Sequence, residues 1–435
     1  MKIALISHGC AKNLVDSELM LGLLTQSGYE TTLDENEAEI VIVNTCSFIH
    51  DAEKESVQSI LELIENNKKV VVTGCLSQKH NEDLKKAIPE LSAIVGTSEI
   101  GKIVDVIDKI ANSNEYLSYV NEKPDYVYPE NVERQQITMG ASSYVKISEG
   151  CNYRCGYCII PNLRGGYHSR PIENIIKEVE TLVKKGVNEI VLIAQDTSSY
   201  GIDLYKKQML PKLLSELEKI EDLQWIRIMY AYPSQMTDEL IEEMARNKKV
   251  VKYVDLPLQH SHKEVLQNMK RPSFDYEELI NKIRSKIPNV AIRTAFIVGY
   301  PGETEEQFEH LYNFVEKMKF EKMGVFQYSR EKNTFSYSMK GQVPAKVKRE
   351  RYNKLMALQQ KISYEINKSY IGKVLDCIVE GYTDDGVVML RSEHDAPEID
   401  GLVYVNSDRH VVPGDIEKVL IEKSDEYDLF GKFVV

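Results

Sequence analysis

The sequence contains no apolar run approaching the ~20 residues that cross a bilayer, and its first residues, MKIALISHGC, turn polar too early for a secretory signal. We therefore expect a cytoplasmic protein with no membrane partner. The sequence also lacks low-complexity tracts, and its content of 43% hydrophobic and 28% charged residues is typical of globular proteins. With 435 residues, the chain is expected to fold as two or three domains.

The sequence has no excess of positive charge, and it lacks the motifs of several common enzyme classes. Its 54 Lys and Arg residues against 67 Asp and Glu residues give a net charge of −13. This charge disfavours a general affinity for nucleic acid, where Lys and Arg must neutralise phosphate, and it favours a basic partner. Because a Walker P-loop, H-E-x-x-H and G-x-S-x-G are absent, nucleotide hydrolysis, zinc proteolysis and serine hydrolysis are unsupported.

Cysteine is scarce, and three of the seven cysteines form a dense C-x3-C-x2-C triplet. Cys151, Cys155 and Cys158 follow a predicted strand at residues 144–147. A 4Fe-4S cluster needs one ligand per iron, so three thiolates would leave one iron open for another ligand. Zinc would need a fourth ligand, for which His168 is a candidate, but no C-x2-C or H-x3-5-H partner pair exists. The triplet therefore favours an iron–sulfur cluster.

Three further cysteines are far apart in sequence but regularly placed. Cys10, Cys46 and Cys75 each come just after a predicted strand, at residues 2–7, 40–43 and 69–73. Ends of parallel strands share one edge of a sheet, so these thiols could converge there and bind a cluster. The alternative is three buried thiols, and spacing alone does not decide between the two. Cys377 shares a strand face with Leu375 and Val379, which indicates core packing.

The pattern of elements predicts an α/β protein with three folded parts. A βα repeat over residues 1–118 predicts a parallel sheet covered by helices, and the polar segment 119–136 is interpreted as a linker. Six strands alternate with helices in residues 137–369, which fits an open (βα)6 partial barrel that ends in a long connecting helix. From residue 370 to 435, period-two patterning with turn signals predicts a small antiparallel β-barrel.

The triplet resembles the hallmark of the radical S-adenosylmethionine superfamily, which has an aromatic residue before the last cysteine, here Tyr157. The resemblance implies that Cys151, Cys155 and Cys158 hold a catalytic 4Fe-4S cluster. It also implies that the open iron of this cluster chelates S-adenosylmethionine, which one electron then cleaves to a 5′-deoxyadenosyl radical. We count Tyr157 among the expected cofactor-binding residues.

The same resemblance points to three other cofactor-binding residues. Gly299 and Gly302 lie in TAFIVGYPGE, a strand that runs into a turn, and glycines there let backbone approach a ligand. The alternative is a structural turn followed by a helix with a capping box from Thr304 and Gln307, and both can hold together. Gln195 follows a predicted strand at the position where the superfamily binds the methionine amino group, although the usual glycine pair and glutamate are missing.

Four more polar residues are candidates around these motifs. Arg164 and Arg170 could contact the carboxylate of the cofactor or the substrate, or they could be ordinary surface arginines. His260 and His262 follow another predicted strand, and we expect them to support the site and not to ligate iron.

The segments around the dispersed cysteines resemble the amino-terminal domain of the methylthiotransferases. The resemblance rests on GCAKNLVDSE at residues 9–18, on NTC at 44–46 and on TGC at 73–75. It covers nearly the whole chain and implies a carboxyl-terminal TRAM barrel. It also implies that Cys10, Cys46 and Cys75 hold a second 4Fe-4S cluster.

The substrate divides this family, and two observations favour a protein substrate. One branch modifies an adenosine of transfer RNA, and the other, the RimO type, thiomethylates an aspartate of small-subunit ribosomal protein twelve. The segments at residues 12–16, 158–161, 195–198 and 425–429 resemble the RimO type. Residues 370–435 hold 6 basic and 15 acidic residues, which would repel RNA and attract a lysine-rich ribosomal protein. The alternatives are the transfer-RNA enzyme and a non-enzymatic iron–sulfur or zinc module that binds ribosomes.

The resemblance also implies a mechanism and partners. The adenosyl radical would abstract hydrogen from the unactivated β-carbon of the aspartate, which no side-chain base could deprotonate. The second cluster would present methylated sulfur, and a second S-adenosylmethionine would supply the methyl group. The electrons would come from a donor such as a flavodoxin or ferredoxin, and no direct nucleic-acid substrate is expected.

Overall fold

The computed structural model describes residues 1–47, 50–113, 115–126, 128–129, 132–137 and 140–434. It divides into two compact units, each described here by itself. The first unit comprises residues 1–139, 146–153 and 159–170, and the second comprises residues 140–145, 154–158 and 171–435.

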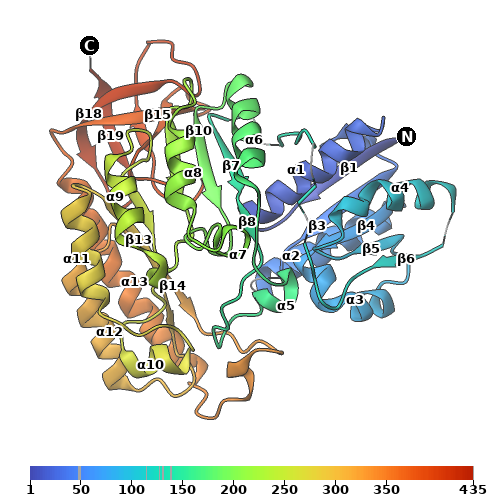
Figure 1. The fold of residues 1–435 in the computed structure, drawn as a ribbon, viewed down its shortest axis with the longest axis horizontal. Helices are drawn as coiled ribbons and strands as arrows, with labels where there is room; N and C mark the ends of the chain where they lie inside the picture. The colour runs from blue at the N-terminus through green and yellow to red at the C-terminus, as the bar shows by residue number, and fades with distance from the viewer. Residues whose placement is uncertain (48–49, 114, 127, 130–131, 138–139, 435) are drawn as a thin grey trace. The chain divides into compact units, whose positions relative to one another are not determined.

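The first unit is a six-stranded sheet with the order β2-β1-β3-β4-β5-β6, and every strand pair is parallel (Figure 1). The strands are β1 Lys2–Ser7, β2 Glu30–Thr32, β3 Ile40–Thr45, β4 Lys69–Gly74, β5 Ala93–Val95 and β6 Leu117–Tyr119. The predicted parallel sheet is confirmed. Strands β2 and β6 were not predicted, because each has only three residues, at an edge and without a buried apolar run.

Helices cover both faces of this sheet (Figure 1). They are α1 Ala11–Gln26, α2 His50–Glu65, α3 Cys75–Ala87 and α4 Ile103–Asn112, with short 3-10 turns at Glu35–Glu37 and Ile100–Lys102. Valines of β3 and β4 pack against Ile60 and Leu63 of α2 and Leu76 and Leu84 of α3. Burial on both faces explains why β3 is apolar without alternation. The helical pattern of the sequence begins at residue 48, which lies outside the described residues, so α2 is given from His50.

The described residues of the segment 119–136, interpreted as a linker, belong to the first unit. Gln135 donates a backbone hydrogen bond to the Glu18 carbonyl of α1 (3.2 Å), and Gly22 of α1 leaves no room for a Cβ beside the Glu133 carbonyl. Residues 133–135 of the segment are therefore packed on α1. The first unit also contains the strands β8 Ser148–Glu149 and β9 His168–Ser169 and the helix α5 Ile160–Arg164.

The second unit contains the predicted open partial barrel. Its strands are β7 Ser142–Lys146, of which the last residue belongs to the first unit, β10 Glu189–Ile193, β11 Trp225–Ile228, β12 Tyr253–Asp255, β13 Ala291–Val298 and β14 Lys322–Gln327. They form two three-stranded sheets, β11-β10-β7 and β12-β13-β14. A parallel bridge between Ile226 and Val250 and a hydrogen bond from the Ala231 N–H to the Asp255 carbonyl (3.0 Å) join the two sheets.

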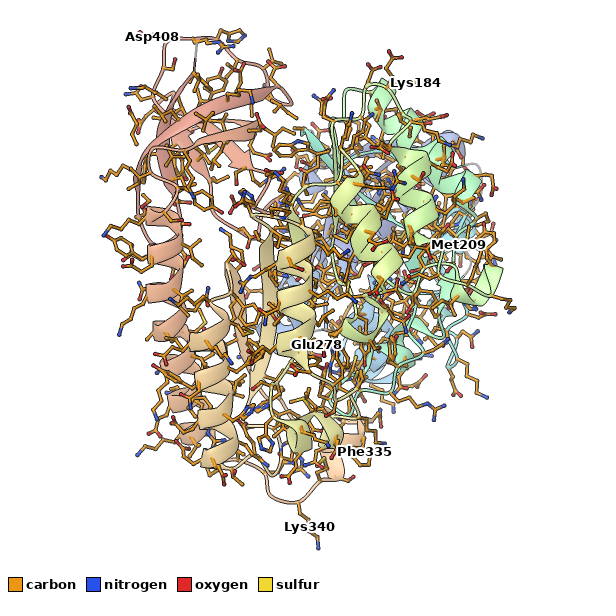
Figure 2. All side chains as sticks on the ribbon, turned by 60° about the vertical axis from the view of Figure 1, so that its left-hand side comes forward. Lys184, Met209, Glu278, Phe335, Lys340 and Asp408 are labelled. Atoms are coloured by element: carbon orange, nitrogen blue, oxygen red, sulfur yellow. The ribbon has the colours of Figure 1, made fainter. Side chains whose placement is uncertain are left out.

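Ten helical segments among the described residues accompany these strands. They are α6 Ile172–Lys184, α7 Ile202–Tyr205, α8 Leu210–Leu217, η3 Pro233–Gln235, α9 Asp238–Arg246, α10 Lys263–Asn268, α11 Tyr276–Lys286, α12 Glu305–Met318, η4 Phe335–Ser338 and α13 Ala345–Lys368. Thr304 and Gln307 form the predicted capping box at the start of α12. Figure 2 shows the segment with Phe335 and Lys340 near one end of α13 and the barrel loop with Asp408 beyond the other end.

The chain ends in a closed barrel with the strand order β15-β16-β17-β19-β18. The strands are β15 Val374–Tyr382, β16 Val388–Ser392, β17 Val403–Val405, β18 Ile416–Ser424 and β19 Leu429–Phe433. The barrel is confirmed, but β17 and β19 pair in parallel, which corrects the expectation of purely antiparallel pairing. The reason is topological: β16 is antiparallel to both β15 and β17, and β18 is antiparallel to both β15 and β19. β17 and β19 therefore both run in the direction of β15. Cys377 packs in the barrel core as predicted.

A buried ionic group ties the barrel to the core sheet within the second unit. Glu189 of β10 accepts hydrogen bonds from Arg227 of β11 (2.8 Å), from Ser142 of β7 (2.7 Å) and from Arg391 of β16. Both arginines and the glutamate are at most 1% exposed. Burial alone would raise the pKa of Glu189, but Arg391 and Arg227 outweigh it and lower that pKa to about 2.

We predict that Glu189→Gln destabilises the second unit by about 3–5 kcal/mol, because it leaves two buried guanidinium groups without their counter-charge. The depressed pKa means that Glu189 contributes its full stability above the ordinary glutamate value of 4.5 and loses it as pH falls toward about 2. Urea unfolding, followed by the fluorescence of Trp225, the single tryptophan, measures the decrease in the free energy of unfolding. Asp376→Asn, which breaks an exposed pair with Lys418, is the matched control and should cost less than about 1 kcal/mol. Equal losses in the two variants would contradict the prediction.

Candidate iron–sulfur and cofactor sites

The three dispersed cysteines follow adjacent strands of the first unit. Cys10 follows β1 and caps the start of α1, Cys46 follows β3, and Cys75 begins α3 directly after β4. Because β1, β3 and β4 are neighbours in a parallel sheet, the three residues lie at one edge. A Cβ on Gly9 would lie 3.0 Å from the Cys46 Sγ, so the loop that carries Cys10 passes directly over Cys46.

The pKa of the Cys75 thiol also indicates that the three cysteines lie close together. Burial raises the pKa of the Cys75 thiol above its ordinary value, and the proximity of Cys10 and Cys46 adds to this rise. The Arg164 guanidinium opposes it. Cys10 and Cys46 therefore lie close enough to Cys75 to affect its ionisation, as a shared cluster would require.

Asn13 fixes the backbone that carries these thiols. Its Nδ2 donates to the His8 carbonyl after β1 (3.1 Å) and to the Thr45 carbonyl of β3 (2.9 Å), and its carbonyl accepts from Asn44 (2.8 Å). Gly74 is required beside it, because its φ is +95° and a Cβ would lie 2.4 Å from the Thr45 carbonyl oxygen. The edge of the sheet is therefore a rigid platform for Cys10, Cys46 and Cys75.

Arg164, at the end of α5, reaches this platform from the segment that follows the triplet. Its Nη1 donates to Asp16 (2.6 Å) and Glu149 (3.3 Å), and its Nη2 donates to the Asn13 Oδ1 and lies 3.6 Å from the Cys75 Sγ. Lys146 completes the group by donating to Glu149 (2.6 Å) and Asp16. All four charged side chains are at most 3% exposed.

The donor set of the platform fits an iron–sulfur cluster. It consists of three soft thiolates, each of which can bind a different iron. Among the described residues, no group of three or more His, Cys, Asp or Glu side chains is arranged to hold a single metal ion.

The triplet follows β7 and is held by backbone hydrogen bonds within each unit. In the first unit, the Cys151 N–H donates to the Gly165 carbonyl (3.1 Å). In the second unit, the Cys158 N–H donates to the Cys155 carbonyl (3.0 Å), and the Gly156 N–H donates to the Met269 carbonyl (2.7 Å). A Cβ on Gly156 would lie 2.6 Å from the Tyr300 hydroxyl, so only glycine fits between these segments.

A buried arginine, Arg271, contacts the triplet within the second unit. It is 7% exposed, its Nη1 lies 3.8 Å from the Cys155 Sγ and 3.3 Å from the Tyr157 hydroxyl, and its Nη2 donates to the Pro257 carbonyl (2.8 Å). Burial lowers the pKa of Arg271, but Tyr157 and Cys155 outweigh it and the net shift is upward. Arg271 therefore presents a permanent positive charge to Cys155 of the triplet.

The structure places the four expected cofactor-binding residues on strand ends and on the triplet loop. Tyr157 neighbours Cys155, and Gly299 and Gly302 follow β13, where Tyr300 links their turn to Gly156. Gln195 follows β10. Ser198, in the same loop, contacts the triplet indirectly through Tyr232. Its Oγ accepts a hydrogen bond from the Tyr232 N–H (2.8 Å), and the Tyr232 hydroxyl lies 4.0 Å from the Cys155 Sγ.

The turn after β13 is built by Glu303. Its carboxylate accepts from the N–H groups of Gly299 and Tyr300 (3.1 Å for Tyr300) and lies 3.4 Å from Arg351. The fully buried His260 has its Nε2 3.6 Å from the other Glu303 oxygen, and burial lowers the pKa of His260. His260 thus braces the turn, and its Nδ1 accepts from the His262 N–H (2.9 Å). At Gly299 and Gly302 φ is +74° and +86°, a conformation that favours glycine.

For Arg164 and Arg170, the structure contradicts one of the two alternatives, that of ordinary surface arginines. Both are buried, so neither is an ordinary surface arginine, and Arg164 contacts Asp16 and the Cys75 Sγ at the platform. Arg170 stacks on Tyr128 (3.5 Å) and donates to the Lys146 carbonyl (2.7 Å). His168, the alternative zinc ligand, is largely exposed and lies 3.5 Å from Asp125. Sequence analysis missed Arg271 and Tyr232, because no local pattern marks a residue that meets the triplet only through the fold.

Comparison with known proteins first defines the class. Residues 2–96 match the uncharacterized protein family UPF0004, residues 145–315 match the Radical SAM superfamily and residues 371–434 match the TRAM domain. The Radical SAM match and the triplet after β7 define the class of radical S-adenosylmethionine proteins, which implies S-adenosylmethionine and a 4Fe-4S cluster as cofactors.

Full-length relatives then define the family. The chain is 51% identical to the ribosomal protein uS12 methylthiotransferase RimO of Caldanaerobacter subterraneus subsp. tengcongensis over 99% of both chains. It is 49% identical to the protein of the same name from Thermoanaerobacter sp. (strain X514), again over 99% of both chains. The chain therefore belongs to the RimO family of radical S-adenosylmethionine methylthiotransferases.

A solved structure supports the fold assignment. The radical S-adenosylmethionine methyltransferase TsrM from Kitasatospora setae aligns with a TM-score of 0.57 at 16% identity, over 75% of this chain and 72% of that chain. At this identity the likeness concerns the fold alone. No helix within the described residues is long and apolar enough to cross a bilayer.

We predict that anaerobically reconstituted protein binds about eight irons per chain, four for each set of three thiolates. Replacing Cys10, Cys46 and Cys75 together with alanine should remove half of the iron if each set holds its own cluster. Iron analysis and absorbance near the sulfur-to-iron charge-transfer bands measure the loss. Cys377→Ala is the matched control and should keep all of the iron, since Cys377 lies in the barrel core. A parent protein with about four irons would contradict the prediction.

We also predict that Arg271→Lys lowers the rate of S-adenosylmethionine cleavage by about 10- to 100-fold, because lysine cannot contact Cys155, Tyr157 and Pro257 at once. The yield of 5′-deoxyadenosine under reducing conditions measures this effect. Arg330→Lys, at an exposed arginine that stacks on Tyr337, is the control and should leave the rate unchanged. Unchanged cleavage in Arg271→Lys would show that the contact is only structural.

Proposed function

We propose that this protein methylthiolates an aspartate side chain of ribosomal protein uS12, using S-adenosylmethionine and two 4Fe-4S clusters. The observation that carries the proposal is the presence of two separate sets of three cysteines, at the platform and in the triplet, in a chain whose full-length relatives bear this name. One set would serve radical formation, and the other would serve sulfur insertion.

The proposal assigns a role to each cysteine set. Cys151, Cys155 and Cys158 would hold the catalytic cluster, and Cys10, Cys46 and Cys75 would hold the auxiliary cluster. When bound, these groups supply a 5′-deoxyadenosyl radical and transferable sulfur. The corresponding domains would be 1–118 for the auxiliary cluster, 137–369 for the radical core and 370–435 for the TRAM barrel, with 119–136 between the first two.

The other residues of the chain position these groups. Arg271 orients the Cys155 side of the triplet and balances thiolate charge in a buried environment. Glu303 fixes the turn of Gly299 and Gly302 through backbone N–H groups, so the turn is preorganised before the cofactor binds. Tyr157 and Gln195 would complete the S-adenosylmethionine site. Abstraction of an unactivated hydrogen then depends on orientation and exclusion of water, which the protein supplies.

The charge of the barrel supports a protein substrate. Residues 370–435 contain 6 basic and 15 acidic residues, and such a surface attracts a basic ribosomal protein and repels RNA phosphates. The electrons would come from a small donor such as a flavodoxin or ferredoxin.

We predict that the reduced protein with S-adenosylmethionine adds one CH3S group, in place of one hydrogen, to a single aspartate of uS12. Tandem mass spectrometry of purified uS12, and of uS12 from a strain that lacks the gene, measures the modification. The Cys155→Ala variant is the control and should form neither 5′-deoxyadenosine nor product. If the deletion strain loses a methylthio group from transfer RNA and retains the one on uS12, the substrate assignment is wrong. If the wild-type protein forms no 5′-deoxyadenosine, the protein is not an enzyme of this class.

A further inference from the structure

Arg164 is a charged residue that touches a platform thiol, the Cys75 Sγ, and its position is strongly constrained. The guanidinium is planar, so two carboxylates at Nη1 fix the direction of Nη2. Nη2 then lies 3.6 Å from the Cys75 Sγ, within hydrogen-bond reach of the large sulfur atom. Because Arg164 is 2% exposed, water does not compete for this contact.

The surrounding charges keep Arg164 ionised and in place. Asp16 and Glu149 face Lys146 and Arg164, so two negative and two positive side chains form a closed, neutral group. The Tyr126 ring lies 4.3 Å from the Lys146 Nζ and covers this group. Arginine does not deprotonate in proteins. Cys75 therefore has a permanently charged donor beside it at every physiological pH.

The neighbouring residue connects the same segment to the triplet. Gly165 accepts the backbone hydrogen bond from Cys151, while Arg164 contacts Cys75 through its side chain. Two consecutive residues of the first unit therefore contact one cysteine from each set. The sequence of the segment explains this placement, because α5 ends at Arg164 and Gly165 at φ +76° redirects the chain toward Cys151.

We propose that Arg164 is a positioning residue that hydrogen-bonds the Cys75 thiolate and thereby raises the reduction potential of the auxiliary cluster. A hydrogen bond to a cluster ligand stabilises the reduced state, which carries one more negative charge, more than the oxidised state. The inference rests on the proposed function, because it requires a cluster on Cys10, Cys46 and Cys75.

The test measures the potential of the auxiliary cluster alone. A full-length parent with Cys151, Cys155 and Cys158 replaced by alanine retains only this cluster, and electron paramagnetic resonance during a redox titration gives its midpoint. Arg164→Lys keeps the charge but cannot hold both carboxylates and reach the Cys75 Sγ. We expect the ratio of reduced to oxidised cluster at a fixed potential to fall about tenfold, which for one electron is a midpoint lower by about 59 mV.

Lys146→Gln is the matched control, because it removes a charge from the same buried group without a contact to Cys75. Its midpoint should move less than that of Arg164→Lys. An unchanged midpoint in Arg164→Lys, or an equal shift in Lys146→Gln, would overturn the inference, since a general change of charge or packing would then explain the data.

A second measurement keeps the inference testable if either variant fails to fold. In the parent that retains only the auxiliary cluster, arginine labelled with ¹⁵N should show a hyperfine coupling to the reduced cluster, because a hydrogen bond transmits spin density to the donor nitrogen. Absence of this coupling would overturn the inference. The proposed function fails in a different way: a parent that binds no iron at all would show that the platform holds no cluster.

Discussion

The placement of the dispersed cysteines depends on one constraint, which is that neighbouring parallel strands end at a common edge. β1, β3 and β4 are adjacent and parallel, so residues separated by 36 and 29 positions, Cys10, Cys46 and Cys75, reach one platform. The same constraint applies to the second unit, where Gln195 and Gly299 follow β10 and β13. Single residues at the ends of neighbouring parallel strands can therefore bring several functional groups together at one point.

This constraint also explains what could be predicted from the sequence. Apolar runs and helical periods identify the main strands and helices, and cysteines after strands identify the platform. Short edge strands such as β2 and β6 have no such signal, because their residues are only partly buried. The parallel pairing of β17 with β19 depends on how the barrel closes, which strand patterns alone do not reveal.

The two arginines that contact cysteines could not be predicted for a related reason. Arg164 and Arg271 meet thiols that are 89 and 116 residues away, and nothing in their local sequence marks that meeting. The alternative that Arg164 is a surface arginine is wrong, because its counter-charges Asp16 and Glu149, which are distant in sequence or on another element, allow it to be buried. An arginine can be buried only where carboxylates balance its charge, and the folded structure is needed to show which carboxylates do so.

The closure of the carboxyl-terminal barrel limits how it can recognise other molecules. Every strand in it has two hydrogen-bonded neighbours, so no strand edge is available for an added peptide strand. Any partner of the barrel would instead contact the side chains and loops of the barrel. Most charged side chains of the barrel are acidic. Recognition of that kind weakens as salt concentration increases, and it tolerates variation in the backbone shape of the partner.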